Sequence, residues 1–307
     1  MARFRLILAF FALATLAAGV IAVAYFWEKV VKPQQIVVTK IDERKHRKGG
    51  PDIELPDLGK REFDAAMALV KEGELLGARD RLYYLLKFFP ESKTVAEAKR
   101  IIGEINLDLL LSGIPMEGKT EYVVKSGDAL VSIARRNKCT VDYILRANAN
   151  TSPVIHPGDR LTVTDLDFTV VVDASDKALR VESKGRLFKE YPIVELNIPH
   201  SVKPPVSTTV TEKVAWYGDR SVNFTQVEYL QAKKWLKSGK LGLMIRAYET
   251  PGLRAEPVAK DRSQKVDKNA AATPRETEAP VGVLMDPADM DELFTIVRGD
   301  IPLKFIN

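Results

Sequence analysis

The chain has one cysteine and three histidines in 307 residues. Cys139 cannot form an internal disulfide, and a single thiol cannot build a multi-thiolate metal site. His46, His156 and His200 lie far apart in the chain and show no metal-ligand spacing. These absences exclude a disulfide scaffold and most metal and redox chemistry, so we expect no metal and no cofactor.

The chain also lacks a long stretch of one charge. The formal charge is +5 and the pI is near 9.0, but basic residues are interleaved with acidic ones and form no stripe. We therefore expect no nucleic-acid binding. With 46% hydrophobic and 28% charged residues, the composition is that of a globular protein. The length predicts two or three structural units.

A long uncharged run is present near the N-terminus. Residues 6–27 contain no charged side chain, and a helix of this length spans roughly 33 Å, which is enough for a hydrocarbon layer of about 30 Å. Arg3 and Arg5 precede the run, so the positive-inside rule places the short N-terminus in the cytoplasm. Residues 1–28 are therefore predicted to be a retained inner-membrane anchor. The alternative is a signal peptide cleaved after Ala24.

The segment that follows changes from a linker to helices. Residues 29–60 are rich in charge, glycine and proline, which predicts a linker. From Glu62 onward apolar residues recur at helical spacing, Pro90 ends this run, and a second helix is predicted up to Leu111. Residues 61–113 are thus predicted to be a helical pair that could meet a protein partner. The positions that resemble one and a half tetratricopeptide-type repeats are Ala66, Gly73, Ala78, Leu82 and Pro90. A plain helical hairpin is the alternative.

Residues 120–165 predict a small βααβ unit. In chain order its parts are a strand at 122–124, a polar turn at 126–128 that caps the next helix, helices at 130–134 and 141–147, a loop with Pro153 and Pro157-Gly158, and a strand at 161–163. The lone Cys139 lies between the two helices. At such a place a free cysteine behaves as a small hydrophobic residue, so we expect it to pack in the core.

This unit resembles the LysM family. The matching features are a Y-x-V-x-x-G-D-x-L-x-x-I-A start, the central Asn148 and an I-x-P-G-x-x-L-x-V end. The resemblance implies binding of an N-acetylglucosamine polymer, which is peptidoglycan or chitin. The family's groove between two loops maps to Gly127, Asp128, Ala129, Leu130, Ser152, Pro153, Val154 and Ile155. Backbone groups in two loops suit acetamide groups, but Gly127 and Asp128 also have a structural reading as turn and helix cap.

Beyond Asp167 the sequence alternates as short strands separated by polar turns. The run from Phe168 to Val194 resembles the opening of an L,D-transpeptidase catalytic domain, an all-β fold in which a cysteine thiolate attacks peptidoglycan stem peptides. Further matches are the Pro205–Val210 stretch, Trp235-Leu236 before a strand, and the ending Met285–Ile306. The resemblance covers residues 167–307, with a polar insertion at 254–280.

The catalytic residues of that family are missing here. The family's S-H-G-C-I-R-M loop reads A-P-V-G-V-L-M in this chain, so Gly282 stands at the cysteine position and Leu284 at the arginine position. Arg246 stands where the family has a histidine, and an arginine remains protonated and cannot act as a base. Residues 201–307 contain neither cysteine nor histidine. We therefore expect no catalytic residues in this region.

Together these features predict a multidomain α+β protein with a transmembrane helix, a helical hairpin, a βααβ LysM module and a mostly-β C-terminal domain. The predicted function is peptidoglycan binding in a bacterial cell envelope, with a catalytically inactive L,D-transpeptidase-like domain. One alternative is an active L,D-transpeptidase that uses another nucleophile, such as Cys139. A helical-repeat scaffold in which the LysM module is secondary is a further alternative.

Overall fold

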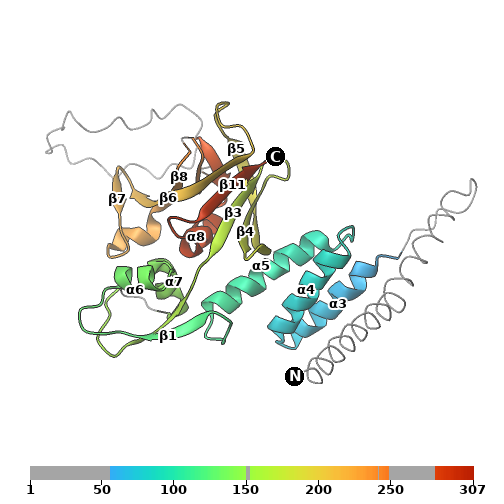
Figure 1. The fold of residues 1–307 in the computed structure, drawn as a ribbon, viewed down its shortest axis with the longest axis horizontal. Coiled ribbons are helices and arrows are strands. Elements are labelled where there is room, and N and C mark those ends of the chain that lie inside the picture. The colour runs from blue at the N-terminus through green and yellow to red at the C-terminus, as the bar shows by residue number, and fades with distance from the viewer. Residues whose placement is uncertain (1–55, 150–152, 241, 249–280) are drawn as a thin grey trace, which may run out of the picture. The chain divides into compact units, whose positions relative to one another are not determined.

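The computed structural model describes residues 56–149, 153–240, 242–248 and 281–307. The predicted anchor at 6–27 and the insertion at 254–280 lie outside these residues, as does most of the predicted linker. Within the described ranges, no helix combines the length and hydrophobicity needed to cross a membrane. Residues 58–307 form one compact unit of helices followed by a small βααβ domain and a β-barrel (Figure 1).

Three helices, and not a pair, precede the βααβ domain. They are α3 (Leu58–Lys71), α4 (Leu75–Phe88) and α5 (Val95–Leu111). The run predicted as one helix is broken at Gly73, whose φ of +80° lies in the left-handed region that glycine adopts without strain. The three helices share a core of small and aliphatic side chains, which are Ala66, Ala78, Leu82, Leu85, Ala98, Ile102, Ile105 and Leu109.

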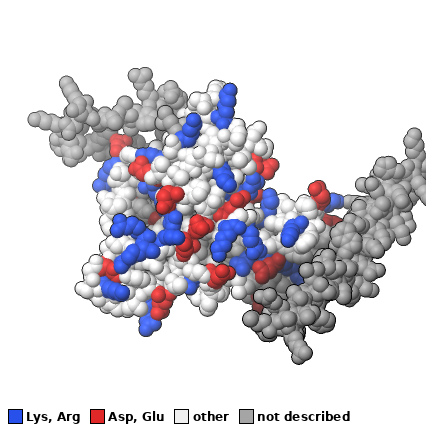
Figure 2. Space-filling model, viewed as in Figure 1, with Lys and Arg blue, Asp and Glu red and all other residues white. Residues whose placement is uncertain are grey.

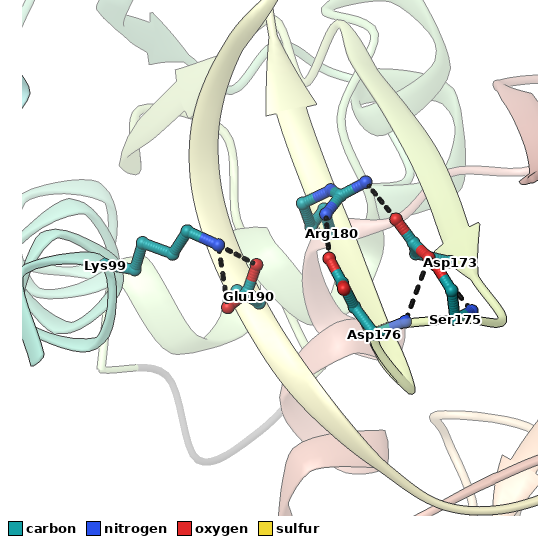
Figure 3. Close-up of polar contacts among 6 residues, drawn as sticks. All are labelled: Lys99, Asp173, Ser175, Asp176, Arg180 and Glu190. Carbon is teal, nitrogen blue, oxygen red and sulfur yellow. Dashed lines mark hydrogen bonds and ion pairs between the residues drawn. The ribbon is translucent and has the colours of Figure 1, made fainter. Parts of the chain in front are cut away.

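Helix α5 packs on strand β5 (Arg186–Asn197) of the barrel. Asn106 is buried, and its side-chain amide donates to the Phe188 carbonyl at 2.7 Å. Beside it, Lys99 of α5 pairs with Glu190 of β5 at 3.1 Å (Figure 3). Gly103 gives room for the stem of Lys189, because an added Cβ would lie 2.9 Å from that side chain. The helical part is therefore fixed to the barrel by packing and by hydrogen bonds.

The predicted βααβ order is confirmed. Strand β1 (Lys119–Val123) pairs with β2 (Arg160–Thr164) in an antiparallel ladder, with helices α6 (Leu130–Arg136) and α7 (Val141–Ala147) between them. The buried side chains of this domain join the main core of the barrel. Both short helices end at an asparagine whose side chain donates to the carbonyl four residues earlier.

The described C-terminal strands form a closed barrel. They are β3 (Phe168–Asp173), β4 (Ala178–Ser183), β5, β6 (Val206–Tyr217), β7 (Arg220–Val222), β8 (Lys233–Ser238), β9 (Met244–Ala247), β10 (Gly282–Met285) and β11 (Pro302–Ile306). The order β11-β3-β4-β5-β10-β9-β8-β6 closes because β11 also pairs with β6, and β7 extends β6. Closure leaves few unpaired strand edges in this part of the chain.

The strands predicted after Asp167 are confirmed, but one feature of the C-terminal part differs from the prediction. Trp235 and Leu236 lie within β8, not before a strand. The ending contains helix α8 (Pro287–Ile296), whose Leu293, Phe294 and Ile296 are buried in the core. Arg180 of β4 pairs with Asp173 of β3 and with Asp176 in the turn between the two strands (Figure 3).

The charged side chains on the face shown in Figure 2 are mixed, with Lys and Arg interspersed among Asp and Glu. This view shows no continuous basic area. The intermixing follows from the sequence, in which the two signs alternate over short distances.

Candidate functional site

The two loops at one end of the βααβ domain contain turns of the same construction. Residues 125–128 read Lys-Ser-Gly-Asp and residues 156–159 read His-Pro-Gly-Asp. In each turn the last N–H donates to the first carbonyl at 3.1 Å, and the aspartate carboxylate accepts the first N–H at 2.9 Å and 2.7 Å respectively. Gly127 and Gly158 have φ values of +83° and +97°, which other residues adopt only with strain. The repeated x-x-Gly-Asp pattern therefore makes one turn twice, and we call the pair the twin turns.

Backbone hydrogen bonds hold the twin turns next to each other. The Val124 N–H donates to the Asp159 carbonyl at 2.8 Å, and the Gly158 N–H donates to the Val124 carbonyl at 2.8 Å. These bonds continue the β1–β2 ladder into the loops. The first turn, which contains the predicted residues Gly127 and Asp128, thus lies beside the turn at 156–159, which directly follows the predicted residues 152–155.

Asp128 locks the first turn and does not cap helix α6. The residue at the helix N-cap is Ala129, which has no side chain that could accept a bond. The Asp128 carboxylate instead accepts the Lys125 N–H, the Tyr122 hydroxyl at 2.7 Å and the Arg136 guanidinium. These three donors, the backbone N–H first, lower the pKa of Asp128 to about 2. The predicted capping role was wrong, because a tighter local turn takes up the carboxylate.

The eight predicted glycan-contact residues do not all reach the surface. Gly127, Ala129 and Val154 are exposed, Val154 to 63%. Asp128, Pro153 and Ile155 are half-buried. Leu130 is only 3% exposed and packs in the core, so its side chain cannot contact a ligand there. Ser152 lies outside the described residues.

Sequence reasoning named Asn148 and Gly158 but did not predict the contacts through which they shape this site. One set of such contacts is made by the three donors to Asp128. Another is made by Asn148, which connects the end of α7 to β2, because its amide donates to the Thr162 carbonyl at 3.1 Å and accepts the Thr162 N–H at 2.7 Å. These bonds fix the base of the second loop. The signal that could have identified Asp159 and Gly158 is the repeat of Gly-Asp at the same place in both loops.

Helix α7 is fastened to the barrel by a polar cluster. Asp142 accepts the hydroxyl of Tyr229, which lies on the 3₁₀ helix η2 (Val227–Gln231), at 2.7 Å, and pairs with Lys213 of β6 at 3.6 Å. Thr140 donates to the Thr295 carbonyl of α8 at 2.5 Å. We call these contacts the α7 junction. Burial lowers the pKa of Lys213 to about 8, although Asp142 acts in the opposite direction.

Two of the three barrel positions that the sequence resemblance predicts to replace catalytic residues are neighbours on paired strands. Leu284 of β10 is the register partner of Arg246 of β9, and Gly282 is opposite Asn197 of β5. Leu284 is fully buried, and Gly282 is buried with a φ of +129°. A Cβ at Gly282 would lie 2.5 Å from the Met244 carbonyl oxygen. This backbone leaves no room for a cysteine side chain.

The side chain of Arg246, which was predicted to stand where the family has a histidine, stacks on an aromatic ring. Its guanidinium carbon lies 5.0 Å from the centre of the Trp235 ring, and Trp235 in turn lies 5.9 Å from Trp216. A guanidinium above an aromatic face is stabilised in its charged form. The arrangement places a cation at this position, and an arginine side chain does not act as a proton acceptor.

Cys139 is buried in the core, with 6% of its surface exposed. Burial raises the pKa of its thiol to about 11, so the thiol stays protonated near neutral pH. Nucleophilic chemistry at Cys139 would require the domain to open. Within the described parts of the chain, no three His, Cys, Asp or Glu side chains come together as a metal site.

Comparison with known families identifies the βααβ domain. Residues 122–164 match the LysM domain family, so this segment is a LysM domain. No curated protein sequence matches the chain.

The C-terminal part is distantly similar in structure to solved L,D-transpeptidases. The enzyme (Yku) from Stackebrandtia nassauensis is 14% identical, with a TM-score of 0.29 over 46% of this chain and 56% of that one. A mutant enzyme from Enterococcus faecium is 16% identical, with a TM-score of 0.27 over 55% and 65%. The enzyme from Mycobacterium smegmatis is 9% identical, with a TM-score of 0.28 over 49% and 64%. The chain thus spans less than two thirds of each of these proteins, and at such low similarity nothing about activity follows.

Proposed function

We propose that this protein binds peptidoglycan in the bacterial cell envelope through the twin turns, and that its barrel does not catalyse transpeptidation. The observation that carries the binding proposal is the LysM domain, whose two loops meet with Gly127, Ala129 and Val154 exposed. Exposed backbone and small side chains let a sugar chain come close to the N–H and C=O groups of the turns.

The binding proposal is tested by co-sedimentation with purified peptidoglycan sacculi. Because the α7 junction fastens the LysM domain to the barrel, deleting the domain would damage the remainder, so a substitution is the sharper test. Ala129→Glu places a charged side chain on the first loop and should weaken binding at least about tenfold. Val194→Glu, at a 48% exposed position on β5, is the matched control. Equal binding by wild type and Ala129→Glu would contradict the site, and absence of wild-type binding would contradict the function.

Three observations support the proposed lack of catalysis. The backbone at Gly282 has no room for a side chain, Arg246 is stacked on Trp235, and Cys139 is buried. A carbapenem acylates the cysteine of active L,D-transpeptidases, so intact-mass measurement after incubation tests the proposal. We expect no adduct. An adduct that disappears in Cys139→Ala would establish the alternative, an enzyme with a displaced nucleophile.

The proposed location is the outer side of the inner membrane, held by residues 6–27 as a retained anchor. An uncharged run of this length supports it. Extraction of membranes with alkaline carbonate should leave the protein in the pellet. Release into the supernatant, with an N-terminus after Ala24, would show that the segment is a cleaved signal peptide.

A further inference from the structure

The positive charge of the LysM domain is unevenly compensated. Residues 122–164 contain six Lys and Arg residues and three Asp residues. Four of the cations have a carboxylate partner, in the pairs Arg136–Asp128, Lys138–Asp165, Arg146–Asp291 and Arg160–Glu121. Lys125 and Arg135 are exposed, and neither has an ion-pair partner within the described residues. The surplus charge therefore lies on the first turn and on α6.

Lys125 is placed directly on the first of the twin turns. Its N–H and its carbonyl both bond to Asp128, at 2.9 Å and 3.1 Å, so its backbone is fixed while its side chain is exposed. Asp128 pairs with the Arg136 guanidinium, which balances its charge, and no ion pair joins it to the Lys125 ammonium group among the described residues. The exposed Gly127 is two residues further on in the same turn.

The aspartate of the second turn, Asp159, does not pair with the Lys125 ammonium group. Its carboxylate accepts the His156 N–H at 2.7 Å and lies 3.8 Å from the His156 ring. It does not come within 4 Å of Lys125, and no ion pair joins the two turns in the described residues. A carboxylate arriving with a ligand therefore meets an ammonium group that is not engaged elsewhere.

Resting on the proposed function, we propose that Lys125 binds a carboxylate of the bound polymer and makes the site prefer carboxylated glycans over neutral N-acetylglucosamine chains. In N-acetylmuramic acid this group is the lactyl carboxylate, which is free where no stem peptide is attached to it. An exposed pair of this kind is weak, so the preference is about two- to fivefold at low salt. It declines as salt is added, because the charges are in water. An ammonium on a flexible stem suits a carboxylate whose position varies along a polymer.

Calorimetric titration of the full chain in detergent with two soluble probes tests the proposal. One is a neutral N-acetylglucosamine oligosaccharide, and the other is an oligosaccharide of equal length in which N-acetylmuramic acid alternates with N-acetylglucosamine. Lys125→Gln should weaken binding of the carboxylated probe about two- to fivefold and leave the neutral probe unchanged. Lys138→Gln, which removes the same charge from the same domain at a position paired with Asp165, is the control and should keep the preference.

Several results would overturn the proposal. Equal affinity of the wild type for both probes would remove the preference itself. A loss that is the same for both probes in Lys125→Gln would show a structural effect of the substitution, and a preference abolished by Arg135→Gln instead would move the role to α6. Failure of the wild type to bind either probe would contradict the proposed function as well, which separates the two outcomes.

Discussion

Glycine has opposite effects in the two regions of the molecule that resemble functional sites. An added Cβ at Gly127 or Gly158 would meet no heavy atom within 4 Å, although both positions have positive φ. At Gly282 the φ is also positive, but an added Cβ would lie 2.5 Å from the Met244 carbonyl oxygen. Glycine therefore keeps the loop surface open in the LysM domain, while in the barrel it lets two strands come so close that no side chain fits.

This difference supports the proposal of binding in one region and no catalysis in the other. The proposed glycan site depends on backbone groups of the twin turns, which small neighbouring side chains leave accessible. Covalent catalysis needs particular side chains in a fixed arrangement. At the barrel positions, Leu284 is buried and Arg246 is stacked on Trp235.

The largest effect is expected for Gly282→Cys, which restores the cysteine of the family motif. The new side chain combines a strained φ with a close contact to the Met244 carbonyl, so we expect a loss of about 3 kcal/mol or more in the free energy of unfolding. We also expect no carbapenem adduct. Denaturant unfolding and intact-mass measurement provide the two readouts.

Gly299→Cys is the control for this substitution, because an added Cβ at Gly299 meets nothing within 4 Å and its φ is not in the left-handed region. It should cost less than about 1 kcal/mol. A Gly282→Cys protein with wild-type stability and a carbapenem adduct would show that the barrel keeps a working cleft, and the contrast between the two regions would fail.

The second prediction concerns Lys213 in the α7 junction, which joins the two regions. The pKa of Lys213 is lowered to about 8 in the folded protein, chiefly by burial, whereas an unfolded lysine has a pKa of about 10.4. Between these values the unfolded chain binds more protons, so the contribution of this group to stability rises with pH from about 8 to about 10. The slope is at most about 1 kcal/mol per pH unit. In Lys213→Met, this rise should be absent from unfolding measured over the same pH range. A wild-type profile parallel to that of the variant would mean that Lys213 titrates normally.

A smaller effect is expected for alanine at the glycines of the twin turns. Gly127→Ala and Gly158→Ala each place a Cβ on a left-handed residue with open space around it, so each should cost about 1 kcal/mol. Gly185 in the β4–β5 turn has a φ of +74° and no heavy atom within 4 Å of an added Cβ. Gly185→Ala should therefore lower the free energy of unfolding by the same amount but leave binding to sacculi intact. Loss of binding in all three variants would indicate global damage and not a local site.

Much of the fold could be predicted because its signals are local. The helix at 141–147, the βααβ order and the first barrel strands follow from apolar periodicity and turn residues close in sequence. The split at Gly73 was missed because the apolar spacing continues across it. The closed backbone at Gly282 depends on Met244, which is distant in sequence, and no local pattern records such packing.

The role of Asp128 shows the same limit on a small scale. A polar residue just before a helix predicts an N-cap, and Asp128 has that position. The carboxylate turns instead toward Lys125, Tyr122 and Arg136, and two of these partners lie more than five residues away. The donors that compete for this carboxylate come together only when the strand, the turn and the helix are assembled.

The smallest effect is expected for replacing either carboxylate of the twin turns with an amide. Asp128 has three donors, one of them Arg136, while Asp159 accepts the His156 N–H and lies near its ring. Asp128→Asn should therefore lower the melting temperature more than Asp159→Asn, although both changes are small because the partner side chains Arg136 and His156 are exposed. Since the folded pKa of Asp128 is about 2 and the usual value is 3.8, its contribution is complete above pH 4 and is lost as the pH falls through about 2. Thermal unfolding between pH 2 and pH 5 should show the gap between wild type and Asp128→Asn closing toward the acidic end. A gap that is constant over this range would mean that the carboxylate charge does not hold the first turn.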